Sequence, residues 1–171
     1  MIHNQDTICA IATAPGGAIG TIRISGQHTF DIADKVFRPQ GSSPALSKRK
    51  PYTIAFGHIT DTTGEEVDEV LASIFRAPHS YTGEDAIEIS CHGSAYILQR
   101  VLQLLIDAGA RMAAPGEFTQ RAYLNGKMDL AQAEAVADLI ASTNKATHQL
   151  AMSQLRGHFS DELALLRDQL L

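Results

Sequence analysis

Residues 115–140 read PGEFTQRAYLNGKMDLAQAEAVADLI, and the rest of the chain is organised around this stretch. Pro115–Gly116 and Asn125–Gly126 are both turn signals. The residues between them, 117–124, are enough for about two turns of helix. The stretch therefore predicts a short helix between two sharp turns.

A second helix is predicted to begin at Asp129, directly after this corner. The Asp129 carboxylate can accept from the free N–H groups of the first turn, and Gln132 can reach back, as in a capping box. Lys127 lies at the corner, on backbone that is held on both sides. A flexible cation in this position is well placed to meet an anion.

The composition is that of an ordinary globular protein of one or two domains. The 171 residues are 44% hydrophobic and 19% charged, and the formal net charge is −5. This negative charge argues against a surface that binds nucleic acid by charge alone. Cys9 and Cys91 each lie in an apolar run without a CxxC motif, so we expect reduced core thiols and not a zinc or redox site.

Neither a membrane span nor a secretory leader is predicted. No apolar run reaches the roughly 18 residues that a membrane helix needs. Residues 1–6, MIHNQD, lack the basic-then-apolar order of a signal peptide. We therefore expect a cytoplasmic protein.

The clearest strand signal is the alternating run 19–25, IGTIRIS. Its alternation places Ile22 and Ile24 on one face of a sheet and Arg23 on the other, with Ser25 beside it. In the same way, the run 86–91 predicts a strand with Glu88 facing away from its apolar neighbours. Both charges are expected on sheet faces and not in loops.

Other elements follow from periodicity and turn residues. Further strands are predicted at 6–13, 52–59, 67–75 and 110–113, and helices at 29–37 and 94–108. The strands 52–59 and 67–75 are joined by the hairpin signal Asp61–Gly64. Residues 38–51 are predicted to form a surface loop. The basic cluster at 48–50 could contact phosphate, but we expect its side chains to be solvated.

From residue 129 onward the sequence reads as helical, with no proline and Gly157 as its one glycine. Its second half carries an apolar stripe of Leu155, Phe159, Leu163, Leu166 and Leu170. Either this stripe folds back on residues 129–143, or a partner chain or a further part of the same chain covers it. We favour a chain that is truncated.

Five motifs along the chain resemble one known family. They are Asp6–Ile8, Ile19–Gly20 through Arg23–Gly26, Thr82–Asp85, Cys91–Gly93, and Pro115–Phe118 running on to Ala135. In this order they resemble the MnmE (TrmE) family of tRNA-modifying GTPases. The sequence departs from the family pattern twice: the turn 14–18 has no Arg, and Gly93 is followed by Ser94 in place of a second glycine.

The resemblance implies an α+β fold, with a mixed sheet and flanking helices like the folate-binding domain of glycine-cleavage aminomethyltransferases. It divides the chain into residues 1–118, a formyl-tetrahydrofolate-binding and dimerisation domain, and residues 119–171, the start of a helical domain. The family's GTPase domain is expected beyond residue 171. In agreement, the sequence contains no GxxxxGK[ST] phosphate loop.

Three charged residues are the candidate binding residues: Arg23, Glu88 and Lys127. Each alone has an ordinary explanation, respectively a structural ion pair, an edge-strand charge and a solvated turn lysine. The resemblance implies that the three together bind 5-formyl-tetrahydrofolate. A carboxylate suits the N–H edge of a pterin, and cations suit the glutamate tail, so we expect Glu88 at the ring and the two cations at the remaining polar parts.

The role of His92 has two alternatives. A histidine between a strand and a helix can contact a ligand, or it can form a hydrogen bond with the backbone. No catalytic residue and no metal ligand is assigned to this chain, and we expect it to catalyse nothing by itself. A separate acid–base pair that would support a free-standing folate-dependent methyltransferase is not evident.

The resemblance also implies partners. The family forms homodimers through this domain and acts with the flavin- and NADH-using protein MnmG on the wobble uridine of certain tRNAs. GTP, Mg²⁺ and K⁺ are expected only in the GTPase domain. The alternative from another class is a purely structural dimerisation scaffold without ligand.

Overall fold

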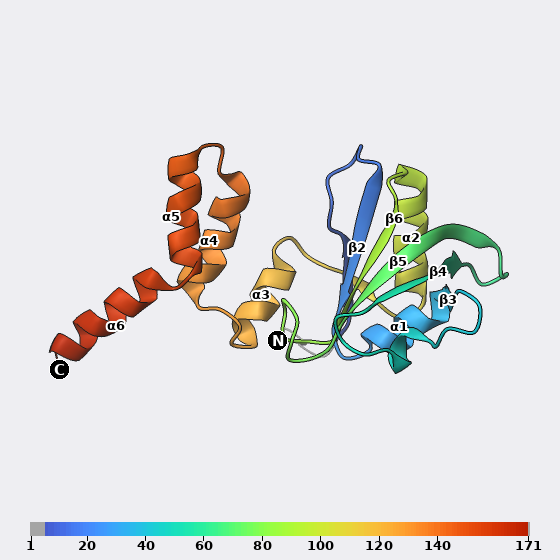
Figure 1. The fold of residues 1–171 in the computed structure, drawn as a ribbon, viewed down its shortest axis with the longest axis horizontal. Coiled ribbons are helices and arrows are strands. Elements are labelled where there is room, and N and C mark those ends of the chain that lie inside the picture. The colour runs from blue at the N-terminus through green and yellow to red at the C-terminus, as the bar shows by residue number, and fades with distance from the viewer. Residues whose placement is uncertain (1–5, 171) are drawn as a thin grey trace. The chain divides into compact units, whose positions relative to one another are not determined.

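The computed structural model describes residues 6–170, without the side chains of residues 158, 159, 169 and 170. It divides into two compact units, residues 1–118 and 119–171 (Figure 1). Residues 1–5, which belong to the segment 1–6 that is predicted not to be a signal peptide, lie outside the described residues. No helix in the described part of the chain is both long enough and apolar enough to cross a membrane.

Within the described residues, the first unit is built on one seven-stranded sheet in the order β3-β4-β5-β6-β2-β1-β7. The strands are β1 (Ile8–Ile11), β2 (Ile19–Ser25), β3 (Phe37–Pro39), β4 (Ile54–Thr60), β5 (Glu66–Phe75), β6 (Ala86–His92) and β7 (Arg111–Met112). Among the strand pairs of the described residues, β1–β7 alone is parallel, so the sheet is mixed. The predicted α+β class and the 61–64 hairpin are confirmed.

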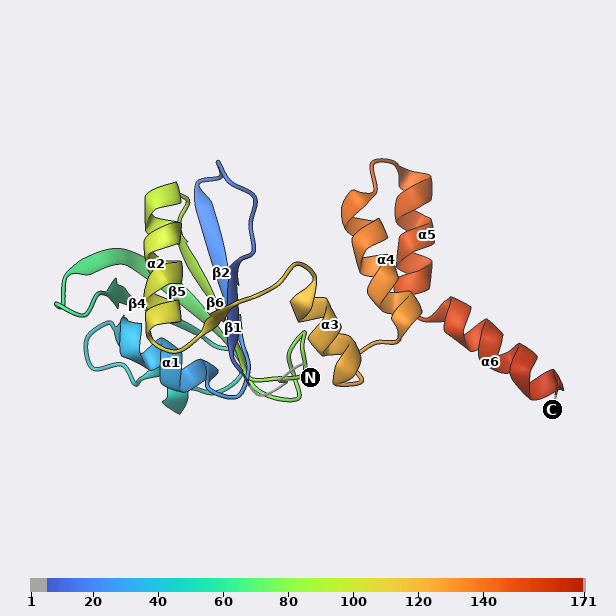
Figure 2. The same ribbon diagram turned by 180° about the vertical axis from the view of Figure 1, so that it is seen from behind.

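Helices α1 (Thr29–Val36) and α2 (Ala95–Asp107) cover one face of this sheet. Both lie behind the strands in Figure 1 and in front of them in Figure 2. The covered face is apolar, with Ile22, Ile24, Ile87 and Ile89 all at 0% exposure. Because side chains alternate along a strand, the neighbouring residues point to the uncovered face.

The prediction of a surface loop at 38–51 is wrong in part. β3 occupies its beginning, and the short 3₁₀ helix η1 (Leu46–Lys48) lies inside it. The Asp34 carboxylate accepts from the backbone N–H groups of Leu46 and Ser47, at 2.8 and 3.2 Å, and the Leu46 side chain is completely buried in the core. A contact between a helix and a distant loop leaves no local sequence pattern.

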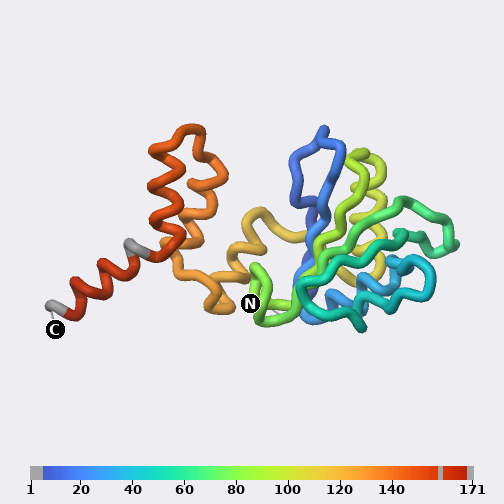
Figure 3. The backbone as a smooth tube through the Cα atoms, viewed as in Figure 1, coloured from blue at the N-terminus to red at the C-terminus, as the bar shows by residue number. Residues whose placement is uncertain are grey.

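The second unit is helical, and Figure 3 shows the course of its backbone. It contains α4 (Leu130–Ala141), α5 (Lys145–Leu155) and α6 (His158–Leu170), while α3 (Glu117–Leu124) runs across the unit boundary. The predicted capping box is confirmed. The Asp129 side chain accepts from the Gln132 N–H at 2.8 Å, and the Gln132 side chain accepts from the Asp129 N–H at 2.9 Å.

The helical run breaks twice after α4. Asn144 caps α5 by accepting from the Thr147 N–H at 3.0 Å, and Gly157, with φ +84°, separates α5 from α6. It is α5 that packs against α4. Leu163 and Leu166 of the predicted stripe are exposed, so they do not fold back on 129–143; the side chains of Phe159 and Leu170 lie outside the described residues.

Candidate functional site

Arg23 and Glu88 lie directly opposite each other on neighbouring antiparallel strands, β2 and β6. The flanking residues Ile22, Ile24, Ile87 and Ile89 anchor both strands in the core beneath α1 and α2. Since the flanking side chains are fixed on the covered face, the two charged side chains must project from the uncovered face. Residues 65 positions apart in the sequence therefore form a pair.

The pair is held through one carboxylate oxygen. Arg23 donates from Nε to Glu88 Oε1 at 2.9 Å, and its Nη2 lies 2.8 Å from the same oxygen. The guanidinium carbon lies 5.5 Å from the ring centres of both Tyr81 and Phe118, which is within the range of a cation–π contact. About 30% of each charged side chain is exposed, so the pair contributes no more than about 1 kcal/mol to folding.

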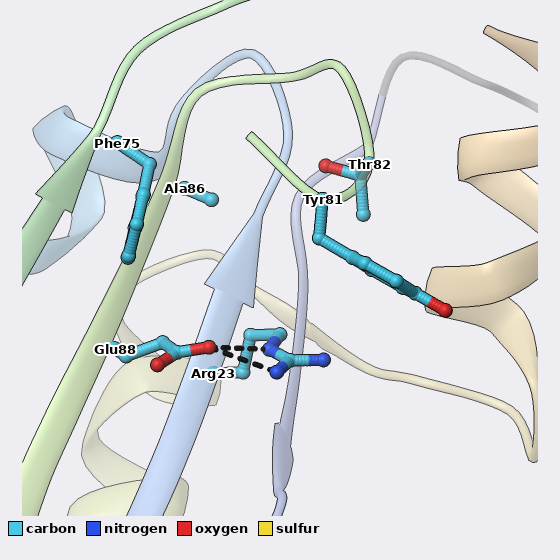
Figure 4. A pocket seen from close by; sticks show the side chains of 6 residues that line it. All are labelled: Arg23, Phe75, Tyr81, Thr82, Ala86 and Glu88. Carbon is cyan, nitrogen blue, oxygen red and sulfur yellow. Dashed lines mark hydrogen bonds and ion pairs between the residues drawn. The ribbon is translucent and has the colours of Figure 1, made fainter. Parts of the chain in front are cut away.

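A cavity of about 130 Å³ adjoins the pair. Figure 4 shows Glu88 and Arg23 on one side of it, with the ring of Phe75 above Glu88 and the ring of Tyr81 beyond Arg23. Thr82 and Ala86 complete its lining. One polar wall and two aromatic rings thus enclose a space that a flat, polar-edged ring system suits.

The loop that carries Tyr81 is bonded to the end of β2. The Ser25 hydroxyl lies 2.7 Å from Thr82 Oγ1 and donates to Glu84 Oε2 at 2.7 Å. The Asp85 carbonyl accepts from the Gly26 N–H at 3.0 Å. The motif Thr82–Asp85 therefore acts by holding the loop, and Ser25, predicted beside Arg23, is buried because this loop covers it.

Two further motifs meet at Arg111, and their role is structural. Glu117 accepts from Nη1 and Nη2 of Arg111 at 3.1 and 2.6 Å, while Asp6 accepts from its Nε at 2.6 Å. Glu117 also accepts from the Ala114 N–H at 2.8 Å. These two carboxylates raise the pKa of Arg111 above its usual range. The motifs at Asp6 and at Glu117 thereby hold the start of β1 against the start of α3.

Lys127 belongs to the second unit, at the corner after α3. Its backbone N–H donates to the Ala122 carbonyl at 2.8 Å, and Gly126 before it has φ +71°, a conformation that favours glycine. The side chain is exposed. The structure therefore brings Arg23 and Glu88 together in the first unit, whereas Lys127 belongs to the second unit.

His92 ends β6, four residues beyond Glu88 and hence roughly 13 Å along the strand. Its Nδ1 lies 2.7 Å from Asp68 Oδ1, and its backbone N–H donates to Asp68 Oδ2 at 2.8 Å. The His92 ring therefore pairs with the buried carboxylate of Asp68 and not with the backbone, which was the simpler of its two expected roles. His92 lines a different cavity, of about 300 Å³, together with Ile19, Phe56 and Leu71.

Both cysteines are buried free thiols, as predicted. Burial raises the pKa of Cys9 to about 11. Burial and the negative charge of Asp68 raise the pKa of Cys91 to about 12. At neutral pH both thiols are protonated, so neither is suited to nucleophilic chemistry.

A comparison with protein families identifies the group to which the chain is related. Residues 7–127 match the family described as GTP-binding protein TrmE N-terminus. The chain belongs to this family. The matched residues include the whole sheet, the Arg23–Glu88 pair and Lys127.

Several bacterial proteins named tRNA modification GTPase MnmE are similar to the chain. Those of Bacteroides fragilis and Bacteroides thetaiotaomicron are 67% and 68% identical over 169 residues, 98% of this chain. That of Parabacteroides distasonis is 61% identical over 168 residues, again 98% of the chain. In each case the chain spans only about 36% of the relative's length.

Sequence reasoning did not find the aromatic part of the cavity. Tyr81 lies in a loop and Phe75 at the end of a strand, and neither position carries a ligand pattern. The turn residues that follow Tyr81 indicate a bend but not the direction in which its ring points. The contacts of this loop with Ser25 and Gly26 bring Tyr81 to the pair.

Proposed function

We propose that this chain is the ligand-binding and dimerising part of a tRNA-modification GTPase, and that it binds a one-carbon tetrahydrofolate, 5-formyl-tetrahydrofolate. The observation that carries the proposal is the Arg23–Glu88 pair on the wall of an aromatic-lined cavity. The family resemblance suggests the ligand, and the chemistry of this wall is consistent with it.

Glu88 has binding capacity left after its contact with Arg23. Both Arg23 contacts go to Oε1, and among the described residues nothing donates to Oε2. A pterin ring presents an exocyclic amine and a ring N–H side by side, and a carboxylate accepts such a pair with charge-assisted hydrogen bonds. Arg23 fixes the carboxylate and reduces the repulsion that it would exert on polar acceptor groups of the ligand.

The size and lining of the cavity suit the ring part of the ligand. At about 130 Å³ the cavity is smaller than the roughly 300–1,000 Å³ of sites that enclose a whole drug-sized molecule. The pterin would therefore occupy it between Phe75 and Tyr81, and the glutamate tail would lie outside. Lys127 enters the proposal from the resemblance, as a cation for that anionic tail.

The dimerisation part of the proposal is supported by apolar side chains on the uncovered sheet face. Ile19, Ile54, Phe56 and Leu71 are 44–66% exposed there. Exposed apolar clusters of this kind are typical of protein interfaces. A second copy of the chain is the partner that the family resemblance suggests.

The activity of the whole protein is part of the same proposal. It would hydrolyse GTP with Mg²⁺ and K⁺ in a separate GTPase domain and modify C5 of the wobble uridine of tRNA together with MnmG, in the cytoplasm. This chain would hold the carbon donor and supply no catalytic group.

Thermal unfolding with and without 5-formyl-tetrahydrofolate tests the binding. Ligand at about a hundred times its dissociation constant should stabilise the chain by roughly 2.7 kcal/mol. Glu88→Gln should remove most of this stabilisation, whereas Glu65→Gln, an exposed hairpin carboxylate, and Lys48→Ala should retain it. Equal effects of the three variants would contradict the site.

The scaffold alternative is favoured by one specific observation: Arg23 and Glu88 already satisfy part of each other's hydrogen-bonding capacity. It predicts no thermal shift at saturating folate, together with a dimer in sedimentation equilibrium. A monomer without a folate shift would contradict both functions.

A further inference from the structure

Three metal-ligating side chains meet at the far end of the uncovered sheet face, away from the Arg23–Glu88 cavity. His58 of β4 and Glu66 and Glu69 of β5 each offer one ligand atom, and these atoms all lie within 4.8 Å of one another. His58 and Glu69 are direct partners in the β4–β5 ladder. The cluster therefore rests on two rigid strands and not on a loop.

A β-bulge is what places both carboxylates on one face. Residues three apart in a regular strand point to opposite faces. In β5, however, Asp68 pairs with Ile59 and Glu66 pairs with Thr60, so Val67 is an additional residue. The bulge turns Glu66 to the face that carries Glu69, and bulges commonly redirect side chains in this way.

The His58 ring is oriented by Gln40. His58 Nε2 lies 2.6 Å from Gln40 Oε1, and an amide oxygen can only accept, so Nε2 carries the ring proton. The other ring nitrogen, Nδ1, then holds a lone pair. It is buried, and among the described residues it has no hydrogen-bond partner.

A second acceptor lies close to Nδ1. Glu66 Oε2 lies 3.1 Å from it, and a carboxylate has no hydrogen to donate. Two acceptors at this distance repel unless a proton or a metal cation lies between them. Metal-binding histidines are typically held in this manner, with the second ring nitrogen donating to a fixed oxygen.

We propose that His58, Glu66 and Glu69 of one chain bind a divalent transition metal ion of the zinc type. Bonds of about 2.0–2.2 Å in a tetrahedral arrangement separate neighbouring ligand atoms by about 3.4 Å, close to the observed Nδ1–Oε2 separation. An imidazole with two carboxylates suits Zn²⁺ better than Mg²⁺, which prefers oxygen and water ligands. Three protein ligands leave a fourth position for water or another ligand.

Titration calorimetry with Zn²⁺ in a non-chelating buffer tests the site. The wild-type chain should bind one ion per chain, and Mg²⁺ at the same concentration should not compete. His58→Gln and Glu66→Gln should each weaken binding at least about tenfold, and Gln40→Leu should weaken it by about 10–100-fold, as loss of an orienting partner does. The controls His79→Gln and Glu65→Gln, both exposed and outside the cluster, should bind as the wild type does.

Imidazole ¹⁵N chemical shifts provide a readout that does not depend on variant folding. Zn²⁺ should shift Nδ1 of His58 in the wild-type chain, and a chelator should reverse the shift. A response equal in His58 and His79, an unchanged affinity in His58→Gln, or one ion per two chains would each overturn the proposal. In those cases a proton alone joins His58 to Glu66, or the ligands are not those of a single chain.

Discussion

The two faces of the sheet use alternate residues of the same strands for opposite purposes. On the face under α1 and α2, β2 and β6 contribute isoleucines with no exposure. On the uncovered face the same strands contribute the Arg23–Glu88 pair, and β4 and β5 contribute the cluster of His58, Glu66 and Glu69. Stability is thus expected to depend on one face and ligand chemistry on the other.

The largest effect is expected from a cavity on the covered face. Ile89→Ala should lower the free energy of unfolding by about 2–5 kcal/mol, because Ile89 is fully buried and its neighbours can close the space only in part. Thr21→Ala on the uncovered face, where the side chain is half-buried and lies outside the proposed apolar interface, should change it by no more than about 1 kcal/mol. Urea unfolding followed by circular dichroism measures both, and similar losses would abolish the distinction between the faces.

The next effect concerns a part of the uncovered face that the loop of Tyr81 buries. Ser25→Ala removes a hydroxyl that bonds to Thr82 and Glu84, and should cost about 1–3 kcal/mol. Ser73→Ala, a half-buried serine of the same face, is the matched control and should be nearly neutral. Equal unfolding midpoints for the two variants would show that the loop does not depend on Ser25.

A smaller effect on folding is expected from the charged pair itself. Glu88→Gln should change the free energy of unfolding by no more than about 1 kcal/mol, since the pair is partly exposed. The same variant should lose most of the stabilisation by 5-formyl-tetrahydrofolate. A large loss of stability without any change in folate response would indicate that the pair is structural.

The smallest effect is a difference in reactivity that leaves the fold unchanged. A pKa of about 11 for Cys9, in place of the ordinary 9.0, lowers its thiolate fraction at neutral pH about a hundredfold. Cys91, at about 12, should react still more slowly. Iodoacetamide labelling followed by mass spectrometry should be slow in the native chain and fast in denaturing urea; rapid native labelling would show that the covered face opens readily.

Much of the fold follows from local sequence. The bounds of β2, of α3 and of the Asp129 cap could be predicted because alternation, glycine turns and capping residues act over a few positions. The break between α4 and α5 was missed although Ser142 and Asn144 are capping residues, because no proline or glycine marks it. Capping residues alone are a weak signal for a helix break.

The candidate sites depend on contacts that no local pattern contains. That Arg23 and Glu88 face away from the apolar residues could be predicted from alternation, but their direct pairing required the strand order. Tyr81 reaches the cavity through its loop's bond to Ser25, and Glu66 joins Glu69 through a single unpaired residue. Register and loop docking are set by long-range packing, so they could not be predicted.

The bulge at Val67 makes the register of the β4–β5 ladder, and not only its composition, a determinant of chemistry. If Val67 itself paired with Thr60, the ladder would run on without interruption and Glu66 would turn to the side beneath the helices, although no ligand had been substituted. Loss of the bulge would thus remove the cation site while all three of its ligands remain in the sequence.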